Sequence, residues 1–143
     1  ILFAVMSLFF YFKLSPKIQT KNLLSFNQDE ISNCIIRDEK KDSEQKIENS
    51  TEFIEQYIFL IQKNARRIHT DVAIAAIADY IVKFEIQSEP IILSFVYSPK
   101  CSSAICYSIG DTKKITSKIG VIEVNEKGAI EIQKLIIESM KKS

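Results

Sequence analysis

The 143-residue sequence has few residues of the kinds that form turns or disulfides: three glycines, three prolines and three cysteines. It has no tryptophan. So few glycines and prolines favour regular helices and strands joined by simple loops. The chain also lacks a glycine-rich phosphate loop and has a single histidine, so no recognisable set of catalytic residues stands out. We therefore expect a protein that is not an enzyme and needs no cofactor or metal ion.

The sequence also lacks a surplus of charge of either sign. Its 19 Lys and Arg residues against 18 Asp and Glu residues give a net charge of +1. A nucleic-acid-binding domain usually carries a basic surplus on one face, so nucleic acid is not an expected partner. A hydrophobic content of 46% is enough for the core of one small domain.

The one long apolar run is residues 1–12, with the sequence ILFAVMSLFFYF. It is shorter than the roughly 20 residues that cross a bilayer as a helix. As a helix it would be apolar on every side, whereas a helix of a soluble domain usually keeps one polar face. We expect residues 1–14 to be a membrane anchor in contact with lipid, or the end of a longer one. The core of a signal peptide and a buried element of the domain are the alternatives.

The side of the membrane stays open at this point. Lys13, Lys17 and Lys21 follow the apolar run, and positive flanks favour the cytoplasmic side. A pair of cysteines near residue 100 favours an oxidising compartment instead. We expect a periplasmic or extracellular domain, with the cytoplasmic orientation as the alternative.

The rest of the chain divides into a polar linker, residues 15–48, and a small domain, residues 49–143. The linker holds a run of mixed charges at residues 37–44, which is typical of a solvated surface. Isoleucines recur every seven residues from Ile47 to Ile68, which predicts a helix from about residue 49 to 68. A second, buried helix is predicted over Val72–Phe84, with Asp79 and Lys83 on its polar stripe.

Three strands and a final helix are expected after that. The strands are predicted at Ile91–Tyr97, Ala104–Ile109 and Ile115–Val124, because these runs are rich in β-branched and aromatic residues. Apolar residues at helical spacing over Ala129–Met140 predict the helix. The expected fold is α+β: an N-terminal apolar anchor helix, then helix, helix, a three-stranded antiparallel sheet and a helix, with the helices on one face.

Cys101 and Cys106 are separated by four residues in the loop between two expected strands. A disulfide between them would close a small ring, which stabilises a fold by about 2 kcal/mol in the chain-entropy model. We expect this disulfide. Two reduced thiols are the alternative, and a redox-active pair is a weaker one, because thioredoxin-like motifs have two intervening residues.

Four residues could in principle bind zinc: Cys34, His69, Cys101 and Cys106. Their spacing belongs to no recognisable zinc motif, so no metal site is expected. His69 is expected to be an ordinary residue at a corner between helices, and Cys34 a partly buried residue or an intermolecular thiol. Asp79 is the carboxylate most liable to a perturbed pKa, which an ion pair with Lys83 would explain.

This layout favours a membrane-anchored, non-enzymatic protein whose domain binds other proteins. The partners would be other membrane or envelope proteins, or further copies of the chain, in an assembly such as a secretion, conjugation or pilus machine. A secreted effector or inhibitor and a thiol redox protein built on Cys101 and Cys106 are alternatives.

A third alternative rests on a resemblance. An apolar N-terminal segment, a long helix and a sheet with a disulfide loop are similar in outline to type IV pilins and pseudopilins. That resemblance implies a structural polymer subunit. It covers no motif: those proteins carry a glutamate at the fifth position of the mature helix, where this chain has Val5, and Lys13 and Pro16 interrupt the apolar segment.

Overall fold

The computed structural model describes residues 15–72, 77–110 and 118–142. These residues form three α-helices, a short 3-10 helix and seven strands. In chain order the elements are α2 (Pro16–Leu23), η1 (Gln28–Glu30), β1 (Ile31–Asp38), β2 (Ser43–Lys46), α3 (Ser50–Asn64), β3 (Ala65–Thr70), β4 (Tyr80–Ile86), β5 (Glu89–Val96), β6 (Ser103–Ile109), β7 (Lys118–Val124) and α4 (Glu126–Lys142).

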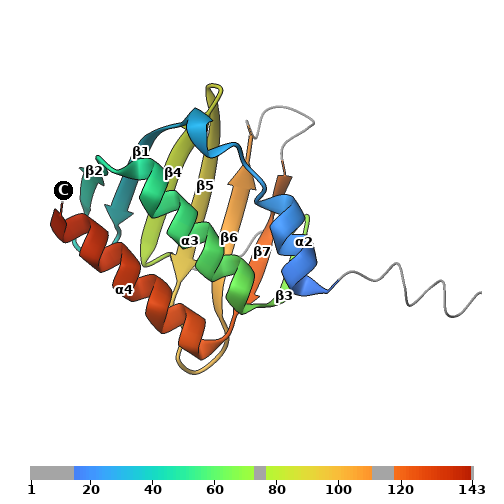
Figure 1. Cartoon of the computed structure of the whole chain (residues 1–143). Helices are drawn as coiled ribbons and strands as arrows, with labels where there is room; N and C mark the ends of the chain where they lie inside the picture. Colours follow the sequence, from blue (N-terminus) through green and yellow to red (C-terminus); the bar gives the residue numbers. More distant parts are fainter. Residues whose placement is uncertain (1–14, 73–76, 111–117, 143) are drawn as a thin grey trace, which may run out of the picture.

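The described strands make one antiparallel sheet in the order β2-β1-β4-β5-β6-β7-β3. Figure 1 shows the helices on one face of this sheet, with α3 and α4 side by side across it and α2 near β3. The hydrophobic core fills the space between that face and the helices.

Helix α3 is fixed to the centre of the sheet by its apolar face. Ile54, Tyr57 and Ile61 recur at helical spacing and are fully buried. The Tyr57 hydroxyl donates a hydrogen bond of 3.1 Å to the carbonyl oxygen of Leu93, in the middle of β5. A buried hydroxyl that finds such a partner escapes the cost of burying an unpaired polar group.

Helix α4 approaches the end of α3 closely. The Asn125 side chain caps α4 by accepting a hydrogen bond of 2.7 Å from the Gly128 N–H. Gly128 lies directly against the Asn64 side chain, where any Cβ would overlap it. The Asn125 N–H donates to the Asn64 carbonyl oxygen at 3.1 Å. Glycine at residue 128 therefore permits the contact between the two helices.

The expected three-stranded sheet is wrong, because the sheet has seven strands among the described residues. The first cause is the helix predicted over Val72–Phe84. Tyr80–Ile86 is strand β4, in which buried Val82 and Phe84 alternate with Lys83 and Glu85 on the other face. Asp79 precedes the strand. It pairs with Lys40 at 3.6 Å and not with Lys83, and its carboxylate accepts the Tyr97 N–H at 2.7 Å.

The second cause lies in residues 15–48, which the sequence analysis assigns to a linker. They contribute α2, η1 and the strands β1 and β2. The run of mixed charges falls on the turn between these two strands, where Arg37 pairs with Glu39, Asp42 and Glu44. The third cause is β3, which follows α3 directly where a longer helix is predicted.

The expected N-terminal anchor at residues 1–14 lies outside the described residues. Within the part of the chain that the structure describes, no helix is both long and apolar enough to cross a membrane. The expectation of a single-pass transmembrane helix, and the membrane localisation that rests on it, is corrected by this finding.

Candidate functional site

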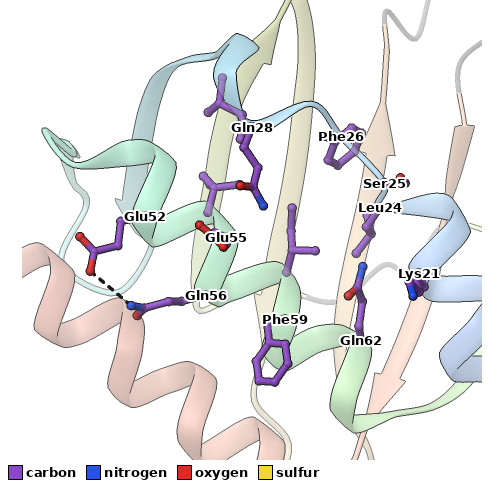
Figure 2. A pocket seen from close by; sticks show the side chains of 13 residues that line it. Lys21, Leu24, Ser25, Phe26, Gln28, Glu52, Glu55, Gln56, Phe59 and Gln62 are labelled. Atoms are coloured by element: carbon purple, nitrogen blue, oxygen red, sulfur yellow. Dashed lines mark hydrogen bonds between the residues drawn. The ribbon is translucent and has the colours of Figure 1, made fainter.

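A groove of about 540 Å³ runs between α3 and the segment that leads from α2 into β1 (Figure 2). One wall consists of residues 52–62 of α3, and the other of residues 21–31. We call it the α3 groove. Its lining residues are Lys21, Leu24, Ser25, Phe26, Gln28, Ile31, Glu52, Ile54, Glu55, Gln56, Ile58, Phe59 and Gln62.

The apolar lining of the α3 groove belongs to the edge of the hydrophobic core. Leu24, Ile31 and Ile54 are buried core residues, and Phe26 and Ile58 are half-buried against the core. The ring of Phe26 packs edge-on against Phe84 of β4, with 5.9 Å between the ring centroids. Because these side chains are held by the packed core, the groove is formed before any ligand binds.

Phe59 is the unusual residue of the α3 groove. Its side chain is 59% exposed, and it is the one aromatic residue among the exposed large hydrophobic residues of the described chain. It lies two turns after Glu52, on the face of α3 that points away from the sheet. An apolar ring in that position contributes little to the stability of the fold. The free energy gained by removing it from water is therefore available to a partner that covers it.

Charge varies along the groove. Glu52 and Glu55 lie toward the N-terminal end of α3, while Lys21 and Gln62 lie toward the other end (Figure 2). Glu52 contacts Gln56 at 3.5 Å, but neither glutamate has an ion-pair partner among the described residues. The acidic end is therefore able to attract a cation on a ligand.

A second, smaller groove of about 160 Å³ lies on the other side of the first turns of α3. It is formed with the end of α4 and the residues that precede α3, and it shares Glu52 and Gln56 with the α3 groove. The exposed face of α3 is thus a ridge between two hollows. Such a surface offers apolar contact, amide hydrogen bonds and charge, which are the elements of a binding surface.

The cysteines of the predicted disulfide line neither groove. The structure holds Cys101 and Cys106 as free thiols. Cys101 is exposed in the loop before β6, and Cys106 is half-buried within β6, paired in register with Ser94 and Val121. Burial raises the pKa of the Cys106 thiol. Their oxidation to a disulfide stays a prediction.

The structure does not assemble the zinc ligands considered from the sequence. Cys34 is a core residue of β1, and burial raises its pKa to about 12, so its thiol stays protonated at neutral pH. His69 lies on the edge strand β3, where its Nε2 atom is 2.8 Å from Oε2 of Glu123. Among the described residues, no group of three His, Cys, Asp or Glu side chains could hold a metal ion.

The interaction between His69 and Glu123 links β3 to β7. The hydrogen bond to His69 lowers the pKa of the Glu123 carboxyl, and a hydrogen bond from the Ser102 hydroxyl acts in the same direction. These contacts involve partly exposed side chains on an edge of the sheet. They serve to hold the edge strand in place.

Sequence reasoning did not identify the α3 groove, because its second wall falls in residues assigned to a linker. The available signal was Phe59, which interrupts the polar face of a helix that carries Glu52, Glu55 and Gln56. No protein-family model, curated protein or solved structure matches the chain.

Proposed function

We propose that this chain is a non-enzymatic protein-interaction domain that binds a polypeptide segment of a partner in the α3 groove. The observation that carries the proposal is the exposed Phe59 ring at the lip of a groove with an apolar lining. The proposal keeps the protein-binding part of the expectation from sequence and does not include membrane anchorage.

The composition of the groove supports a polypeptide ligand. Protein interfaces combine an apolar centre with a polar rim, and aromatic residues supply much of their energy. Here the apolar part consists of Phe26 and Ile58 within the groove and Phe59 at its lip, and glutamate and glutamine side chains form the rim. A small molecule deep in the groove would leave Phe59 in water, whereas a segment laid along α3 would cover it.

The contribution of Phe59 to the free energy of binding can be worked out from its exposed area. Burying a whole phenylalanine side chain is worth about 1.5–3 kcal/mol, so burying the exposed 59% is worth about 1–2 kcal/mol. That corresponds to about a five- to thirtyfold change in affinity. Phe59→Ala should therefore weaken binding strongly. It should change the free energy of unfolding by less than about 0.5 kcal/mol, because the ring contributes little to the core.

The test is selection of ligands for the full chain from a random library of displayed peptides, followed by affinity measurement by fluorescence anisotropy. Ile130→Ala is the matched control, because Ile130 is also apolar and 51% exposed but lies on α4, outside the groove. Selected peptides should lose affinity for Phe59→Ala and keep it for Ile130→Ala. Equal affinity for both variants, or no selected peptide at all, would refute the proposal.

A further inference from the structure

We infer that the occupant of the α3 groove is an amphipathic α-helix of a partner protein whose basic side chains lie against Glu52 and Glu55. This inference rests on the proposed function and specifies the chemistry of the partner.

The sheet offers little free strand edge next to the groove, which disfavours strand addition as the binding mode. The wall formed by residues 21–31 leads into β1, which pairs with β4 on one side and, over Ile35–Asp38 only, with β2 on the other. For its backbone hydrogen bonds, an extended peptide in the groove would find only residues 31–33 of β1 without a β2 partner, and the irregularity at Asn33 interrupts this short edge. A helix satisfies these groups internally, so it needs only side-chain contacts from the groove.

The dimensions of the groove fit a short helix. The lining residues of α3 extend from Glu52 to Gln62, a rise of about 15 Å or about three turns of helix. Over three turns an amphipathic helix presents apolar side chains at positions i, i+3, i+4 and i+7. These would contact the apolar lining around Phe26, Ile58 and Phe59.

The charges set the orientation of that helix. The carboxylates of Glu52 and Glu55 are exposed, lack ion-pair partners among the described residues and lie toward one end of the groove; the Glu52 carboxylate is turned toward Gln56, on the side of α3 that faces α4 (Figure 2). Lys21 is exposed toward the opposite end. A helix with lysine or arginine at one end of its apolar stripe would place these cations against the glutamates. A helix with acidic residues in the same positions would meet repulsion.

The experiment uses the full chain and three synthetic peptides of about 15 residues. The first two are held as helices by lactam bridges, because an unconstrained helix of this length is only marginally stable, and the third is left unconstrained. The first has leucines at helical spacing and lysines at one end. The second has glutamates in place of the lysines. The third has the composition of the first, with its leucines in an alternating order that suits a strand. Affinities are measured at low and high salt for the wild type, for Phe59→Ala and for a Glu52→Lys, Glu55→Lys double variant.

The inference predicts that the wild type and the double variant prefer opposite peptides. The wild type should bind the lysine peptide about tenfold more tightly than the glutamate peptide, because two exposed ion pairs are gained. The double variant should prefer the glutamate peptide, which also shows that it is folded. High salt should reduce both differences, and the alternating peptide should bind most weakly.

Each other outcome overturns a defined part of the reasoning. If Phe59→Ala weakens binding but lysine and glutamate peptides bind equally, the proposed function stands and the inference fails. The inference also fails if the alternating peptide binds best, or if none of the three peptides binds while the library selection succeeds. If sedimentation shows a dimer of the chain that Phe59→Ala dissociates, the occupant is a second copy and the inference is wrong.

Discussion

The close contact between α3 and α4 predicts that Gly128→Ala destabilises the protein, although alanine is the better helix former. A Cβ atom at residue 128 would lie 2.8 Å from Nδ2 of Asn64 and closer still to its Cβ and Cγ atoms. Ordinary contacts between such atoms are about 3.5–4.0 Å. Asn64 cannot simply turn aside, because it is buried and its Nδ2 donates a hydrogen bond of 2.9 Å to the Leu60 carbonyl oxygen.

Two effects of opposite sign decide how much Gly128→Ala changes the free energy of unfolding. Replacing glycine by alanine within a helix gains up to about 1 kcal/mol. Forcing an extra carbon into a packed contact costs about 1–3 kcal/mol, and losing the hydrogen bond of Asn64 adds about 1 kcal/mol. We expect a net loss of about 1–3 kcal/mol in the free energy of unfolding, since the clash outweighs the propensity.

Urea denaturation measured for Gly128→Ala, Asn64→Gly and the double variant tests this account. The Asn64→Gly background removes the three atoms that the new Cβ would approach most closely. Gly128→Ala should then be neutral or stabilising by up to about 1 kcal/mol. The reasoning is refuted if Gly128→Ala is at least as stable as the wild type, or if its penalty is the same in both backgrounds.

Three further predictions concern other contacts. Tyr57→Phe removes the hydrogen bond to the Leu93 carbonyl oxygen, which lies in a strand paired on both sides, and should lower the free energy of unfolding by about 0.5–1.5 kcal/mol in urea denaturation; an unchanged midpoint would contradict this. The lowered pKa of Glu123 adds stability that is present above its unfolded pKa of about 4.3 and is lost as the pH falls through the lower folded value. That increment, below about 1 kcal/mol, should be smaller in His69→Ala, which keeps the Ser102 hydrogen bond, when unfolding is measured between about pH 3 and 6. Iodoacetamide at about pH 8 should modify the exposed Cys101 and leave Cys34 unmodified in the native protein, as counted by mass spectrometry; if the predicted disulfide forms, Cys101 should react only after reduction.

The strands β5, β6 and β7 and the helix α4 lie where the sequence places them, because their signals are local. β5 and β6 are rich in β-branched and aromatic residues, and α4 has a well-separated apolar face. β4 was missed for a physical reason. The segment VAIAAIADYIVKF is apolar at so many positions that it satisfies both the helical and the strand period. The turn after β4 uses Gln87 and Ser88 at φ values of 51° and 66°, without the glycine or asparagine that marks such hairpins.

Strands β1 and β3 depend on contacts that no local pattern contains. β1 carries an irregularity at Asn33, with φ of 53°, which interrupts the alternation of buried residues. In β3, Ile68 continues the seven-residue spacing of the preceding helix, and only its pairing with Ile122 of β7 makes the segment a strand. The α3 groove could not be predicted from local sequence patterns for the same reason. Phe59 could be placed on a helix, but the opposite wall of the groove belongs to residues 21–31, which the sequence analysis assigns to a linker.

The arrangement of edges and faces also bears on how the protein would meet a partner. A free sheet edge invites another strand, and natural sheets discourage this with short or charged edge strands or by covering them. Both edge strands of the described sheet follow that pattern. β2 has four residues, including Glu44 and Lys46, and β3 carries exposed Arg66 and Arg67 and packs against α2. Strand addition is thus disfavoured at both edges, whereas Phe59 is left exposed on α3 with nothing in the fold that requires it. This contrast between protected edges and an exposed aromatic ring is the reason to look for the partner at the α3 groove.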